Sequence, residues 1–192
     1  MLVKEMSVDM NLATADLVGA SNSLLSWLLN AVLPREWYVA MKKTFCHQLI
    51  VKDGEEEVFM YTESVLPMGN ALTFPAQTLV FYVLAKAIAE LTGTKGRISV
   101  YGDDMIYPSK LHKYVAVIFP KIGLELNMDK TFVHYPFRES CGADYYCGSD
   151  VRPFFLPDMH MMLTRQKYVA WLYKCYNGLK RRFDDESQIR QT

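Results

Sequence analysis

The N-terminal part of the chain alternates between two kinds of hydrophobic pattern. A short, mostly apolar run over residues 11–18 contains Asp16 and stops at Gly19, which predicts a strand carrying one carboxylate. Leucines and a valine then recur at three- and four-residue spacing up to Pro34, which predicts an amphipathic helix capped by Ser21 or Asn22. The first elements are therefore a strand and a helix that packs on it.

Two later segments have the pattern of β-hairpins. Residues 47–52 and 57–62 alternate in character on either side of Asp53-Gly54, a dipeptide typical of hairpin turns. Residues 97–101 and 105–107 are apolar on either side of Gly102-Asp103-Asp104. The second hairpin is predicted to present two carboxylates at its tip.

The remaining periodic segments predict helices. An apolar stretch begins near Pro75 and ends at Gly93, and a second runs over 110–122 with Pro120 near its end. A last helix is predicted over 163–176, before a charged tail from Lys180. Weaker strand patterns cover 124–126 and 131–134, and the stretch after Pro136 is predicted to be rich in loops. Strands mixed with helices and hairpins indicate an α+β fold with a sheet covered by helices on one face.

Composition sets limits on function without naming one. The chain has 192 residues, 51% of them hydrophobic and 22% charged, which suits one globular domain. Lysine plus arginine and aspartate plus glutamate each number 21, so no basic excess indicates a nucleic-acid partner. The longest apolar stretch, 79–89, is interrupted by Lys86 and is too short to cross a bilayer, so no membrane partner is expected.

Cysteine and histidine do not suggest a metal site. The four cysteines form no CxxC pair, which indicates a reducing compartment and argues against zinc. The start of the chain lacks the charge and apolar pattern of a signal peptide, and the four histidines are scattered without ligand spacing.

Three aspartates on strands or at a strand tip need an explanation, because unpaired charge within a sheet is costly. They are Asp16, Asp103 and Asp104. An aspartate after glycine is common in turns, so Gly-Asp-Asp alone is weak evidence. A second aspartate-bearing strand upstream strengthens it, because a few carboxylates are typical ligands of Mg²⁺ or Mn²⁺.

The ordered motifs resemble those of the replicases of single-stranded RNA bacteriophages, the Qβ type, within the viral RNA-directed RNA polymerases. The resemblance covers roughly 12–155. It rests on Ala15 to Ser21, Met68-Gly69-Asn70 with Thr73-Phe74, Val100 to Asp104, Asn127 to Phe132, and Pro136 to Gly142 followed by Tyr145-Tyr146, Gly148, Asp150-Val151 and Pro153-Phe154.

The resemblance implies a polymerase palm with an antiparallel, ferredoxin-like sheet that performs RNA-templated nucleotidyl transfer with Mg²⁺ or Mn²⁺. Asp16 and Asp103 would bridge the metal ions and Asp104 would assist one of them. Lys130 would protonate the departing pyrophosphate, unless it is an ordinary surface lysine.

The resemblance also assigns substrate contacts. Asn70, in the loop led by Gly69, would test the ribose hydroxyls together with Ser21 or Asn22, although a structural loop asparagine is the alternative. Arg138 would hold the nucleic-acid backbone or else pair with Glu139 or Asp144. The family has a second acidic residue where this chain has Asn22 after Ser21.

By the same resemblance, residues 1–137 are expected to form the palm, and 138–192 a block between palm and thumb with a C-terminal helix. The family's basic fingers motif lies upstream of Asp16, where this chain has fifteen residues, so fingers are expected to be absent. The expected partners are RNA, NTPs and a fingers-bearing subunit or host translation proteins, in the cytoplasm of a bacterial host.

Two other functions stay open. A reverse transcriptase shares the palm and a Tyr-x-Asp-Asp turn, although Gly102 and the block at 138–142 favour an RNA polymerase. A solitary palm could instead bind metal, RNA or a larger replicase subunit without catalysis.

Overall fold

The computed structural model describes residues 2–54, 56–156 and 164–183. The chain divides into two compact units, Met1–Gly148 and Ser149–Thr192, and each is described by itself. The segment from 138 to 148 therefore folds with the residues before it.

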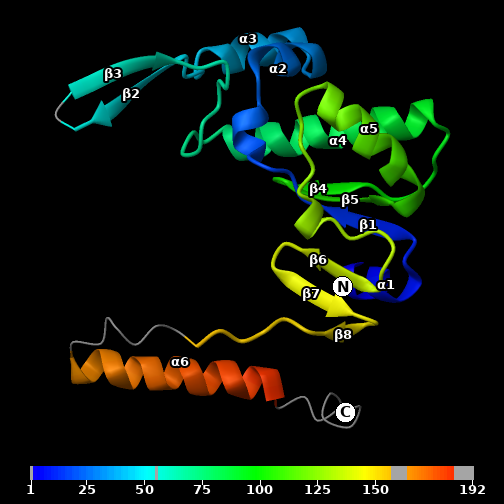
Figure 1. The fold of residues 1–192 in the computed structure, drawn as a ribbon, viewed down its shortest axis with the longest axis vertical. Helices are drawn as coiled ribbons and strands as arrows, with labels where there is room; N and C mark the ends of the chain where they lie inside the picture. Colours follow the sequence, from blue (N-terminus) through cyan, green and yellow to red (C-terminus); the bar gives the residue numbers. More distant parts are fainter. Residues whose placement is uncertain (1, 55, 157–163, 184–192) are drawn as a thin grey trace. The chain divides into compact units, whose positions relative to one another are not determined.

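A three-stranded antiparallel sheet lies at the centre of the first unit (Figure 1). Its order is β1 (Leu12–Ala15), β5 (Asp104–Pro108) and β4 (Ser99–Tyr101). Ala15 lies opposite Met105 and Tyr101 lies opposite Asp104. The strand–turn–strand prediction for 97–107 is confirmed, and the first predicted strand is present but shorter, so Asp16 follows β1 directly.

Helices α4 (Thr73–Leu91) and α5 (His112–Lys121) lie on one side of this sheet in Figure 1. Both predicted helices are confirmed, and α5 tolerates Pro120 because the proline falls in its last turn. The sheet and these helices share a buried core that includes Phe81, Tyr107 and Phe119. The mixed α+β class is therefore confirmed.

Helix α4 is long and apolar enough to cross a membrane by length and composition alone. Eight of its residues are buried within the unit, among them Val80, Phe81 and Ala85. A core helix passes the same length and composition test, so this feature carries no membrane assignment.

Two elements beyond edge strand β1 were not predicted. Helix α1 (Leu2–Asp9) buries Val3 and Met6, and β6 (Phe137–Ser140) pairs with β7 (Ala143–Tyr146) in an antiparallel hairpin. The prediction of loops after Pro136 is thus wrong for this segment. Its strands have four residues each and a tight turn with two positive-φ residues, too short for a periodic signal.

The segment after β1 begins differently from the prediction. A 3₁₀ turn, η1 (Ala20–Ser23), precedes α2 (Ser26–Val32), and α3 (Arg35–Lys42) follows. Ser21 and Asn22 lie inside η1, while Leu25 occupies the N-cap of α2 without a side-chain hydrogen bond. The cap prediction is wrong because the chain uses both polar residues to turn away from the sheet.

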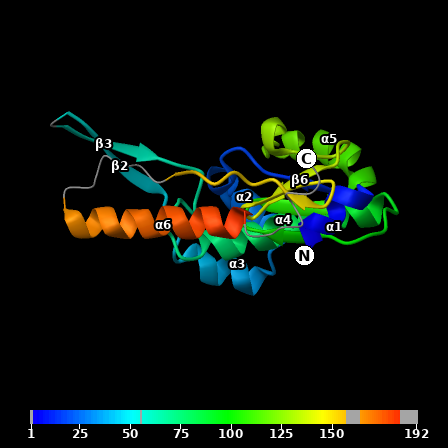
Figure 2. The same cartoon turned by 90° about the horizontal axis from the view of Figure 1, so that it is seen from below.

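Strands β2 (Gln48–Asp53) and β3 (Glu56–Tyr61) form the predicted hairpin. Figures 1 and 2 both show this ribbon reaching away from the sheet and helices of its unit. Its apolar side chains are largely exposed, including Ile50 and Phe59. It therefore forms without a core of its own.

The two weak strand predictions are wrong. Leu126 and Phe132 make only isolated bridges, to Leu17 and Thr14, and η3 (Met128–Lys130) lies between them. A second short 3₁₀ turn, η2 (Ser109–Leu111), leads into α5.

The second unit contains β8 (Ser149–Asp150) and α6 (Arg165–Phe183). Arg182 of α6 donates to the Asp150 carbonyl at 2.8 Å and pairs with its carboxylate at 3.4 Å. The predicted last helix is confirmed and extends further than expected; its predicted start at Leu163 and the tail after Phe183 lie outside the described residues.

Candidate functional site

The turn between β4 and β5 is held from the helix side by α4. The Gly102 N–H donates to Thr78 Oγ1 at 2.9 Å, and the Phe74 ring packs edge-on against Tyr101 with centroids 4.9 Å apart. Gly102 has φ +65°, and a Cβ there would lie 2.6 Å from Phe74 Cε2. Both conformation and space therefore require glycine at this position.

Asp16 reaches the same end of the sheet from β1. Because Ala15 pairs with Met105, the next residues along the two strands are Asp16 and Asp104. Asp16 Oδ1 accepts from the Leu17 N–H at 2.9 Å, and Oδ2 lies 3.3 Å from Lys130 Nζ. The Asn127 amide also donates to Oδ2 at 3.4 Å, so this carboxylate is fixed in position.

Asp104 is half-buried between its neighbours. Its Oδ2 accepts from the Cys141 N–H at 3.0 Å, on the turn between β6 and β7. Burial raises the pKa of the Asp104 carboxyl, and the nearby charges of Asp103 and Asp16 raise it further. The three predicted carboxylates thus lie close enough to repel one another.

The carboxylates are not arranged as a closed metal cage. Among residues 2–54, 56–156 and 164–183, no three His, Cys, Asp or Glu side chains form a group that could hold a metal ion. Within the same ranges Asp103 makes no hydrogen bond or ion pair, whereas Asp104 interacts with both the N–H and the thiol of Cys141. Free carboxylate oxygens suit Mg²⁺, which keeps several ligands from water or substrate phosphate. The chemistry of these donors, carboxylate oxygens, is the kind that Mg²⁺ prefers.

A cavity of about 430 Å³ extends from Asp103 along the start of α4. It is lined by Leu17, Gly19, Ala20, Ser21, Asn22, Met68, Gly69, Asn70, Thr73, Phe74, Gln77 and Asp103. The residues predicted to contact the nucleotide near the ribose therefore line one cavity. They are Ser21, Asn22, Gly69 and Asn70.

The Asn70 side chain, which lines this cavity, has structural hydrogen-bond partners outside its lining. Its Oδ1 accepts from the Leu72 N–H and its Nδ2 donates to the Thr44 carbonyl, both at 2.9 Å. The amide thereby supports the start of α4 in this structure. Within the described residues, the Asn22 side chain makes no hydrogen bond and is the more available polar group.

Lys130 lies on η3, with its side chain mostly exposed. The hydrogen bond to Asp16 and the charge of that carboxylate raise the pKa of the Lys130 ammonium. The structure thus brings the predicted proton donor beside the carboxylates.

Arg138 does not lie on a surface. Its side chain is 0% exposed, and burial lowers the pKa of the guanidinium. It donates to the carbonyls of Leu12, Val133, Tyr135 and Phe137. Among the described residues it has no ion pair with Glu139 or Asp144, and a side chain without exposed surface is poorly placed to hold a nucleic-acid backbone.

Comparison with known proteins gives a family. The family described as RNA replicase, beta-chain, matches residues 1–169. The chain belongs to this family. It is 40% identical over 155 residues to the RNA-directed RNA polymerase beta chain of Escherichia phage MS2, covering 81% of this chain and 28% of that one. It is 37% identical over 153 residues to the corresponding subunit of Escherichia virus Qbeta, covering 79% and 26% respectively.

The matched part of the chain spans less than a third of the length of these curated relatives. The match covers the block of motifs on which the resemblance was based, and the predicted family is thereby confirmed.

Sequence analysis missed three supporting residues of the candidate site. Thr78 accepts a hydrogen bond from the turn at Gly102, and the Cys141 N–H donates to Asp104. Glu139 is a further carboxylate near them. Burial raises the pKa of Glu139, the charge of Asp144 raises it further, and Lys130 lowers it. Only the hydroxyl of Thr78 on an apolar helix could have signalled such a role.

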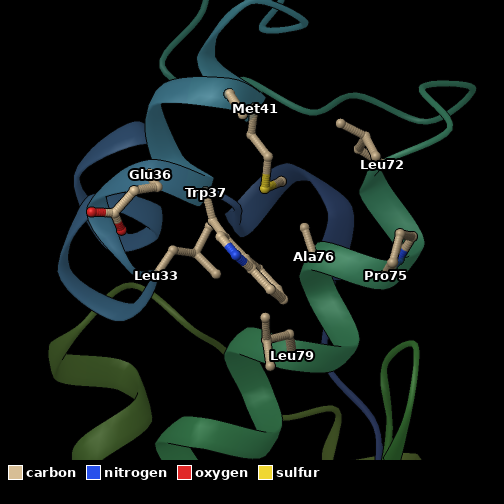
Figure 3. Close-up of a pocket in the computed structure, with 9 residues that line it drawn as sticks. Leu33, Glu36, Trp37, Met41, Leu72, Pro75, Ala76 and Leu79 are labelled. Carbon is tan, nitrogen blue, oxygen red and sulfur yellow. The ribbon is translucent and has the colours of Figure 1, made fainter.

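A second cavity of about 450 Å³ lies between α3 and the start of α4 (Figure 3). Trp37 projects into it toward Ala76 and Leu79, and Glu36 is its one acidic lining residue. It has an almost entirely apolar lining, unlike the cavity beside Asp103.

Proposed function

We propose that the chain is the catalytic palm of a phage RNA replicase and takes part in RNA-templated transfer of nucleotides from NTPs to an RNA 3′-hydroxyl. One observation carries the proposal: Asp16, Asp103 and Asp104 meet at one end of an antiparallel sheet, beside the cavity lined by Gly69, Asn70, Ser21 and Asn22. Membership of the replicase family supports it.

Asp16 and Asp103 would hold two Mg²⁺ or Mn²⁺ ions, with the second oxygen of Asp104 assisting. Bound there, the ions would activate the 3′-hydroxyl and stabilise the leaving pyrophosphate. Lys130, at 3.3 Å from Asp16, would give a proton to that leaving group. A lysine ammonium carries a proton at neutral pH, as an acid requires.

The cavity beside Asp103 would receive the nucleotide sugar. Ser21 and Asn22 offer a hydroxyl and an amide, each able to donate and accept with a ribose 2′-hydroxyl. Asn70 would contribute either directly or by fixing the loop at Gly69 against α4. Arg138 is left out of substrate binding because it is buried.

The expected partners are template and product RNA, NTPs and the remaining regions of a replicase, since the matched region covers only 28% and 26% of the two relatives. Host translation proteins are a further expected partner. A phage replicase works in the cytoplasm of its bacterial host, which is where we place this chain.

The test is a chimera in which residues 1–169 replace the matching region of the MS2 beta chain. Template-dependent incorporation of NTPs is expected, and Asp103→Asn should lower it roughly a thousandfold, the scale of losing several kcal/mol of transition-state stabilisation. Asp9→Asn, the same change at an exposed site on α1, should leave incorporation intact.

A non-catalytic palm is the second candidate, favoured by the short span of the chain. An inactive but folded and RNA-binding chimera would support it. Preference for deoxynucleotides on an RNA template would instead indicate a reverse transcriptase, and Asn22→Ala should narrow the preference for ribonucleotides about tenfold if Asn22 reads the 2′-hydroxyl.

A further inference from the structure

Arg138 is among the largest fully buried side chains of the described structure, and it makes no ion pair there, although the charge of Asp9 lies near enough to act on it. Burying a guanidinium is costly unless each donor finds an acceptor. Here the acceptors are backbone carbonyls of four residues: Leu12, Val133, Tyr135 and Phe137. By bonding to carbonyls of separate segments, the buried Arg138 side chain holds the main chains of those segments together.

The segments tied together by Arg138 are those that flank the carboxylates. The Leu12 carbonyl, bonded at 2.8 Å, belongs to the first residue of β1, the strand that Asp16 directly follows. The Val133 carbonyl, at 3.0 Å, belongs to the segment that follows the Lys130 turn. Arg138 itself is the second residue of β6. One side chain therefore sets where β6 lies relative to β1.

The turn at the end of β6 contacts Asp104 directly. Cys141 adopts φ +52°, a conformation that a side chain other than glycine rarely takes, and Gly142 follows at φ +72°. In this geometry the Cys141 N–H points at Asp104 Oδ2, 3.0 Å away.

We propose that Arg138 is a positioning residue: by fixing β6 to β1, it holds the β6–β7 turn so that the Cys141 amide orients Asp104. The inference rests on the proposed function for the task of Asp104, but the mechanical link from Arg138 to Asp104 does not. A guanidinium is needed because its five donors are spread over a rigid plane, whereas a lysine ammonium offers three donors at one point.

Hydrogen exchange at the Cys141 amide of the 192-residue chain, measured by NMR without metal, tests the link. Asp104→Ala removes the acceptor and should speed exchange at Cys141 about tenfold or more, by freeing the amide to open locally. Arg138→Lys should do the same from a distance. Arg97→Lys is the matched control, since Arg97 is exposed and bonds only Ser99 Oγ, and it should leave Cys141 exchange unchanged.

Arg138→Gln is a second variant in case lysine prevents folding, because its neutral amide keeps two donors. Unchanged exchange at Cys141 in a folded Arg138 variant would overturn the positioning role. Unchanged exchange in Asp104→Ala would overturn the bond on which it depends, whether or not either Arg138 variant folds.

Mn²⁺ binding, measured by electron paramagnetic resonance, tests whether the link from Arg138 to Asp104 affects the proposed metal site. Arg138→Lys should raise the Mn²⁺ concentration for half-saturation about fivefold, and Arg97→Lys should not. If the parent chain binds no Mn²⁺ while the exchange results hold, the proposed function fails and the positioning link stands. If Mn²⁺ binds equally well to parent and Arg138→Lys, orientation of Asp104 by Arg138 is refuted.

Discussion

The two hairpins of the first unit share a turn conformation and differ in everything around it. Gly54 in the β2–β3 turn and Gly102 in the β4–β5 turn both have φ +65°. The β2–β3 ribbon leaves Ile50 and Phe59 each 58% exposed, whereas the β5 residues Met105 and Tyr107 are 0% exposed. A local sequence signal thus specifies the turn. Whether the turn is held rigidly depends on the packing of the strands around it.

The largest difference between the hairpins is expected in the free energy of unfolding that an alanine substitution at each glycine removes. Gly54→Ala meets no atom within 4 Å and should cost only the left-handed strain, about 1–2 kcal/mol. Gly102→Ala adds a collision with Phe74 and should cost about 2–5 kcal/mol in total. Urea unfolding of both variants measures the two costs, and equal values would show that Phe74 does not confine the turn.

The next largest difference is expected in how a substitution on each hairpin changes the stabilisation of the chain by a divalent metal ion. Because Mn²⁺ would relieve repulsion among Asp16, Asp103 and Asp104, a tenfold excess over Kd should stabilise the chain by about 1.4 kcal/mol. That corresponds to a rise in Tm of roughly 3–6 °C for a chain of this size. Asp103→Asn should remove the rise, while Glu57→Gln on the exposed ribbon should preserve it. A parent Tm indifferent to Mn²⁺ would mean that this end of the sheet binds no ion.

The hydroxyl of Thr78 should contribute about 1 kcal/mol to the free energy of unfolding. Thr78→Val leaves the Gly102 N–H without its acceptor at similar side-chain volume. Thr78→Ser keeps the oxygen and should recover most of the loss. Thermal unfolding compares the three chains, and a valine variant as stable as the parent would show that water replaces the hydroxyl.

The smallest expected effect is a gain in stability. Burial and neighbouring carboxylates raise the pKa of Asp104 in the folded chain, so its contribution is fully present below the unfolded pKa and is lost as pH rises through the folded one. Metal-free Asp104→Asn should therefore be more stable than the parent at pH 7 by about 0.5 kcal/mol, after allowance for solvent screening. The gain should shrink as the pH falls below about 4, where the parent carboxyl is protonated. Melting curves at both pH values check the sign.

Sequence patterns predicted the elements whose signals are local. The Asp53-Gly54 hairpin, the apolar stretch of α4 and the strand–turn–strand around Gly102 all follow from period and turn chemistry. The short β6–β7 hairpin and the 3₁₀ turn at Ser21 lack such a period and depend on long-range contacts.

The candidate site could be predicted as a set of residue types but not as a set of contacts. Lys130 and Asp16 are distant in sequence, and their ion pair depends on how η3 meets the end of β1. Arg138 shows the limit most clearly, since an arginine in a polar block suggests a surface role. Only the fold reveals that carbonyls of four residues enclose it.

The bonds of Arg138 also have an evolutionary consequence. Its acceptors are main-chain oxygens, which every residue type carries, so the side chains at Leu12, Val133 and Tyr135 can drift without disturbing them. No compensating pair of substitutions would accompany a change at Arg138. Methods that detect contacts from correlated sequence variation should therefore overlook this residue, although its replacement would loosen two strands at once.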